Sequence, residues 1–126
     1  MNILTDTISP TMDEVIDCIT KKISLVIYEY NINHANEVVT SHTVGTRNND
    51  SYSLSVSIAL SDDLSNERSL NFFVIQNTNN ADVCIIITSC EKEGLRILFK
   101  SINKYPIVGI EKYLPNIINS TIAKLQ

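Results

Sequence analysis

The chain has 126 residues, enough for one domain with its own hydrophobic core. Hydrophobic residues make up 44% and charged residues 19%, a balance typical of globular proteins and not of disordered ones. The formal net charge of −4 disfavours nucleic-acid binding, and no apolar run is long enough to span a membrane. The first six residues lack the basic region of a signal peptide, so we expect a single cytoplasmic domain over residues 1–126.

The first predicted element is a helix from about Pro10 to Tyr30. Ser9 and Pro10 form a favourable start, because serine caps free backbone N–H groups and proline has no N–H to leave unpaired. Apolar residues recur at helical spacing: Met12, Val15, Ile16, Ile19, Ile23, Val26, Ile27 and Tyr30. The second half is also rich in β-branched and aromatic residues. A shorter helix ending near Lys22, with an additional strand over residues 23–30, therefore stays open as the alternative.

Four strands are predicted after this helix, and the clearest runs from Tyr52 to Leu60. Its residues alternate between an apolar face (Tyr52, Leu54, Val56, Ile58 and Leu60) and a face of small residues that includes Ser53, Ser55 and Ser57. Such alternation indicates a strand with one face in a core and the other facing something polar. The other three strands are predicted at Glu37–Thr46, Leu70–Gln76 and Asp82–Ser89, with a polar, acidic connection over residues 61–69.

Two helices are predicted after the last strand. Leu95, Leu98, Phe99 and Ile102 share one apolar helix face, and Lys92, Arg96, Lys100 and Lys104 are spaced four apart on another. Pro106 should end this helix, and a final apolar face from Ile110 to Leu125 should be kinked or restarted at Pro115. The predicted fold is therefore α+β: a four-stranded, possibly five-stranded, antiparallel meander packed against an N-terminal helix and two C-terminal helices.

No residue pattern indicates catalysis or a cofactor. The three cysteines (Cys18, Cys84 and Cys90) have no zinc-ligand spacing. His34 and His42 are eight residues apart across a predicted loop and strand, with no i,i+4 relation and no HExxH motif. The chain has 3 glycines, and they form no phosphate-binding loop or nucleophile elbow. We therefore predict no metal, no cofactor and no enzymatic activity.

Three groups of residues are candidates for binding a partner. Two are acidic: Asp13, Glu14 and Asp17 on the first helix, and Asp62, Asp63 and Glu67 on the connection before the third strand. The third is the row of Ser53, Ser55 and Ser57. Carboxylates would steer a basic partner toward the protein, and a flat face of short side chains is an easy docking platform. The plainer interpretation of each group is an ordinary solvent-exposed surface.

A compact acidic domain without catalytic residues is typical of small protein-binding modules. The most specific hypothesis is a bacterial immunity or antitoxin protein that neutralises a toxin domain, which we expect to be basic and nuclease-like. The alternatives are a secretion-type chaperone for an effector protein and, less favoured, a small enzyme with an unrecognised site. We expect a monomer or a homodimer whose partner is another protein, with no membrane and no nucleic acid.

Overall fold

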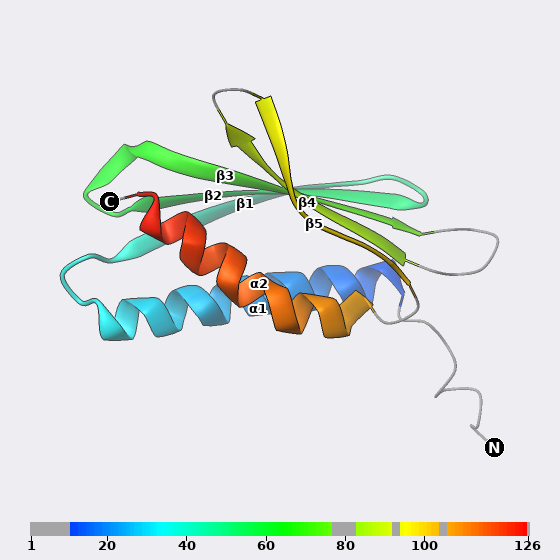
Figure 1. Ribbon diagram of the computed structural model, residues 1–126, viewed down its shortest axis with the longest axis horizontal. Coiled ribbons are helices and arrows are strands. Elements are labelled where there is room, and N and C mark those ends of the chain that lie inside the picture. The colour runs from blue at the N-terminus through cyan, green and yellow to red at the C-terminus, as the bar shows by residue number, and fades with distance from the viewer. Residues whose placement is uncertain (1–10, 77–82, 92–93, 104–105, 126) are drawn as a thin grey trace, which may run out of the picture.

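A computed structural model describes residues 11–76, 83–91, 94–103 and 106–125. The elements follow in the order α1 (Met12–Asn33), β1 (Val39–Arg47), β2 (Ser51–Leu60), β3 (Asp63–Gln76), β4 (Val83–Glu91), β5 (Gly94–Asn103) and α2 (Pro106–Ala123). The strands form one antiparallel sheet of five strands in the order β1-β2-β3-β4-β5, so each strand pairs with its neighbour in sequence. Both helices lie on the same side of this sheet and leave its other face uncovered (Figure 1).

Helix α1 is one continuous helix of 22 residues, in agreement with its apolar periodicity. The alternative strand over residues 23–30 is wrong, because the helical phase continues through this segment. One buried stripe contains Met12, Val15, Ile19, Ile23, Val26 and Ile27. Thr11 is the capping residue, and the predicted start at Ser9 and Pro10 lies outside the described residues.

The core lies between the two helices and the covered face of the sheet. In β2, Val56 and Ile58 are fully buried, whereas Ser53 is exposed, so the predicted facing of this strand is confirmed. The same face of β3 and β4 and the inner face of α2 complete the core with Leu70, Phe72, Val74, Val83, Ile85, Ile87, Ile110, Leu114, Ile118 and Ile122. Leu98 and Ile117 are partly buried and pack against it.

The first predicted C-terminal helix is wrong, because residues 94–103 form strand β5 antiparallel to β4. Ile87 pairs with Phe99 but Thr88 pairs with Ile97, which leaves Leu98 as an extra residue in a β-bulge. The basic ridge expected on that helix is therefore split. Arg96 and Lys100 lie on β5, opposite Ser89 and Ile86, while Lys92 and Lys104 lie outside the described residues.

A single C-terminal helix, α2, follows β5. It continues through Pro115 without restarting there. Strand β3 is longer than predicted, since most of the supposed connection over residues 61–69 belongs to it. Its bulged first part reaches the turn after α2, where the Asn66 side chain donates a hydrogen bond of 3.2 Å to the Leu125 carbonyl oxygen. In the described part of the chain, neither helix is both long and apolar enough to cross a membrane.

Candidate protein-binding surface

Within the described residues, the fold leaves one face of the sheet without a covering element (Figure 1). Two rows of paired residues cross it from β1 to β5: Val44, Ser55, Asn71, Thr88 and Ile97 in one, and Thr46, Ser53, Phe73, Ile86 and Lys100 in the other. Both rows carry a serine on β2, and their larger apolar side chains are Val44, Phe73, Ile86 and Ile97, while the second row ends at Lys100. We call this surface the open face.

The half of the open face on β3 to β5 carries most of its exposed apolar side chains. Phe73 and Ile75 are 37% and 42% exposed on β3, and Leu95 and Ile97 are 68% and 63% exposed on β5. The hairpin of β4 and β5 rises at its end away from the helices, on the side of the open face (Figure 1). Strand β4 lies between the two pairs, with Ile86 opposite Phe73 and Thr88 opposite Ile97. Two pairs of exposed apolar side chains on one face of a sheet are a candidate interaction surface. We call these four residues the apolar set.

The half of the open face on β1 and β2 is small and polar. Ser53, Ser55 and Ser57, the predicted docking row, lie on it in register with Thr46, Val44 and His42 of β1. Ser53 is exposed and the other two serines are half-buried by their neighbours in the sheet. Of the described residues that pair across the open face, Lys100 is the only one charged at neutral pH. Any partner therefore meets a nearly neutral surface.

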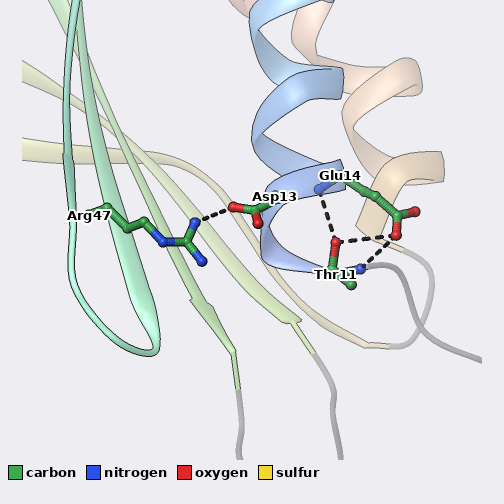
Figure 2. Close-up of polar contacts among 4 residues, drawn as sticks. All are labelled: Thr11, Asp13, Glu14 and Arg47. Atoms are coloured by element: carbon green, nitrogen blue, oxygen red, sulfur yellow. Dashed lines mark hydrogen bonds and ion pairs between the residues drawn. The ribbon is translucent and has the colours of Figure 1, made fainter.

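The three acidic residues predicted as a binding set on α1 contact other residues of the protein, and two of them, Asp13 and Glu14, are drawn in Figure 2. Asp13 forms an ion pair with Arg47 at the end of β1. Glu14 completes a capping box: its backbone N–H donates to the Thr11 hydroxyl at 3.2 Å, and its carboxylate accepts from Thr11. Asp17 pairs with Lys21 at 2.8 Å, one turn further along the helix. This predicted set thus has structural roles at the start of α1.

The second acidic set lies at the opposite end of the molecule's long axis, in the hairpin of β2 and β3 (Figure 1). Asp62, Asp63 and Glu67 are all exposed, and the Ser65 hydroxyl donates to the Asp63 carboxylate at 2.9 Å. The three predicted groups therefore occupy three separate surfaces. The set at Asp62, Asp63 and Glu67, which we call the acidic hairpin, is the one that shares its strands with the open face.

The cysteines and histidines do not come together. His34 stacks on Tyr30 with ring centroids 4.0 Å apart at the end of α1, whereas His42 lies on β1. Burial, and then the nearby Glu111 carboxylate, raise the pKa of the Cys18 thiol, so this cysteine is less readily ionised. Among the residues that the structure describes, no three histidine, cysteine or acidic side chains are grouped as metal ligands would be.

The sequence did not single out the apolar set. Phe73 and Ile75 stand in the predicted strand Leu70–Gln76, for which the sequence specifies no exposed face, and Leu95 falls on the apolar face of a predicted helix. The sequence does contain a signal for it: β3 has apolar residues at both odd and even positions. A strand that is covered on one side needs them at only one of the two. Comparison with protein-family models, with curated proteins and with solved structures finds no match for this chain.

Proposed function

We propose that this protein is a binding module of the immunity or antitoxin type, which neutralises a basic, nuclease-like toxin domain by docking on it through the open face. The observation that carries the proposal is the apolar set. A sheet face that meets only solvent is expected to be polar. Here Ile97 and Leu95 are more than 60% exposed on β5, and Phe73 and Ile75 are exposed on β3, on the same face of the sheet. Covering such residues is the main favourable term in protein association.

Charge supports a basic partner. The net charge is −4, and the acidic hairpin lies at one end of the strands that form the open face. A domain seated on the apolar set can direct basic side chains toward Asp62, Asp63 and Glu67. Charges at the rim of an interface act mainly on the association rate, whereas buried apolar contacts set how slowly the complex dissociates. The two surfaces therefore have different expected roles in one complex.

A secretion-type chaperone is the second candidate function. It is favoured by the position of Leu95 and Ile97 on an edge strand, where an extended apolar segment of an effector can lie along the sheet. The two functions differ in the state of the bound protein, which is folded for an immunity protein and unfolded for a chaperone.

The test of the proposal begins with the product of the neighbouring gene, which should be toxic when it is expressed alone in a heterologous host. Co-expression of this protein should restore growth, and Ile97→Asp should abolish that protection. Leu25→Asp is the matched control, because Leu25 is 48% exposed on α1, away from the open face. Equal melting temperatures of the two variants would show that both are folded. Protection that survives Ile97→Asp, or a neighbour that is not toxic, would contradict the proposal.

The role of the acidic hairpin is measured on the purified complex. Reversing Asp62, Asp63 and Glu67 together to lysine should slow association and flatten its dependence on salt, with little change in the dissociation rate. The same reversal at Asp13, Glu14 and Asp17 should instead lower the stability of the free protein, because it breaks the contacts at the start of α1. If charge reversal at the acidic hairpin leaves the association rate unchanged at two salt concentrations, these charges serve only solubility.

A further inference from the structure

Strand β1 is an edge strand, and the direction of its backbone groups can be assigned. The Ser61 N–H donates to the Val38 carbonyl at 2.8 Å, and the Asn48 N–H donates to the Ser51 carbonyl at 2.9 Å, at the two ends of the β1–β2 pairing. In an antiparallel pair, positions that bond to the partner alternate with positions that do not. Every second residue therefore directs its N–H and C=O away from β2: Val39, Ser41, Thr43, Gly45 and Arg47.

The first of these outward positions is already paired. The Asn31 side chain of α1 accepts a hydrogen bond from the Val39 N–H at 2.8 Å and donates one to its carbonyl at 3.0 Å. This contact confirms that the backbone N–H and C=O of Val39 point away from β2. The Asn31 amide takes the position that a neighbouring strand would occupy. Within the described chain, no hydrogen bond reaches the outward backbone groups from Ser41 to Arg47. We call the seven-residue segment from Ser41 to Arg47 the free edge.

The free edge lacks the features by which proteins protect the edges of sheets. Such edges usually carry lysine, proline, a bulge or a covering element. Strand β1 pairs with β2 without a register shift and contains no lysine, proline or carboxylate. Its one arginine, Arg47, is held by Asp13. The other edge strand, β5, has the bulge at Leu98 and the charged side chains of Arg96 and Lys100.

We propose that the free edge pairs antiparallel with the free edge of a second copy of this chain, which joins two sheets into one around a two-fold axis. The register that uses all of it is self-complementary: Ser41 lies opposite Arg47 of the second copy, His42 opposite Thr46, Thr43 opposite Gly45, and Val44 opposite Val44. No like charges face each other in this register. Because the free edge has no carboxylate, two acidic proteins meet where they repel each other least. This pairing does not depend on the proposed function.

Val44 gives the sharpest test, since it is 55% exposed and lies on the two-fold axis. Analytical ultracentrifugation should show a concentration-dependent dimer of the full chain. Val44→Lys places two lysines opposite each other and should weaken the dimer about ten-fold, and Val44→Asp should do the same. An equimolar mixture of the two variants should associate again, because each lysine then meets an aspartate. Ser53→Lys, on the open face but in β2, is the matched control and should leave the dimer unchanged.

A proline pair tests the direction of the backbone groups. Thr43→Pro removes an outward N–H, so the monomer should stay folded while the dimer is lost. His42→Pro removes an N–H that points to β2, and should destabilise the monomer itself. A wild-type protein that remains monomeric up to roughly 1 mM would overturn the proposal. So would Val44→Lys and Val44→Asp variants that fail to associate when mixed, a result that would leave the free edge to a strand of a different protein.

Discussion

The two faces of strand β3 differ in what covers them, although their side chains are alike. Phe72 and Val74 are fully buried beneath the helices, whereas Phe73 and Ile75 alternate with them on the open face and are 37% and 42% exposed. On β2, by contrast, the residues on the open face are serines. The comparison shows that apolar residues on β3 to β5 exceed what this domain needs for its own core. In the proposed complex, this excess is what the toxin domain would cover.

The largest expected effect comes from the adjacent phenylalanines. Phe72→Ala should cost about 3–5 kcal/mol in the free energy of unfolding, because it leaves a cavity in the core. Phe73→Ala should cost about 1 kcal/mol or less, because its ring is already partly in water and its space can fill with solvent. Urea denaturation of both variants measures the difference. Equal losses would mean that the open face is covered within the monomer.

The next effect concerns Gly45, on the helix-facing side of β1. At this position the covering group is the Tyr52 ring and not helix α1. The Tyr52 ring lies across Gly45, and a Cβ atom at Gly45 would come within 2.9 Å of the ring atoms Cε1 and Cζ. A cross-strand aromatic ring often covers an edge glycine in this way. Gly45→Ala should therefore cost about 1–3 kcal/mol through displacement of the ring.

The control for this clash is the double variant Gly45→Ala with Tyr52→Ser. In that background the alanine should cost much less, so the two changes should be non-additive in thermal or chemical denaturation. An alanine that stabilises the single variant, as replacement of glycine in an unstrained strand does, would show that the ring does not rest on Gly45.

The smallest effect concerns the buried hydroxyl of Thr88 on the open face. Thr88 is 5% exposed, and its hydroxyl has no hydrogen-bond partner in the described structure. Thr88→Val should be neutral or stabilise by about 1 kcal/mol, since it removes an unpaired polar group and keeps the shape. Thr121 is the comparison, because its buried hydroxyl donates to the Ile117 carbonyl at 2.8 Å, and Thr121→Val should be destabilising. A similar loss at both positions would reveal a partner for Thr88.

Periodicity predicted the elements whose pattern is regular. Helix α1 keeps its phase over its whole length, and β2 alternates cleanly, so both were found from the sequence alone. Strand β5 was not found, because the bulge at Leu98 shifts its apolar residues to three- and four-residue spacings that imitate a helix. A bulge depends on the pairing with β4, and spacing along one strand does not reveal it.

The candidate surface was predicted only in its polar half. The serines of β2 were expected on an uncovered face, and they lie there. Strand β3 has apolar residues on both faces, so its sequence does not show which face the helices cover and which is left open. The ion pair at the start of α1 was not predicted, because the sequence does not show that Arg47, far along the chain from Asp13, lies beside it.

The meander order of the sheet has a consequence for folding. Each strand joins its neighbour in sequence, while the contact of α1 with α2 closes a loop that contains all five strands. Closing this loop costs about 2 kcal/mol more in chain entropy than closing a hairpin. During synthesis, α2 also leaves the ribosome after the whole sheet. We therefore expect an interval in which the sheet has formed but both of its apolar faces are only partly covered, and refolding yield should fall as protein concentration rises.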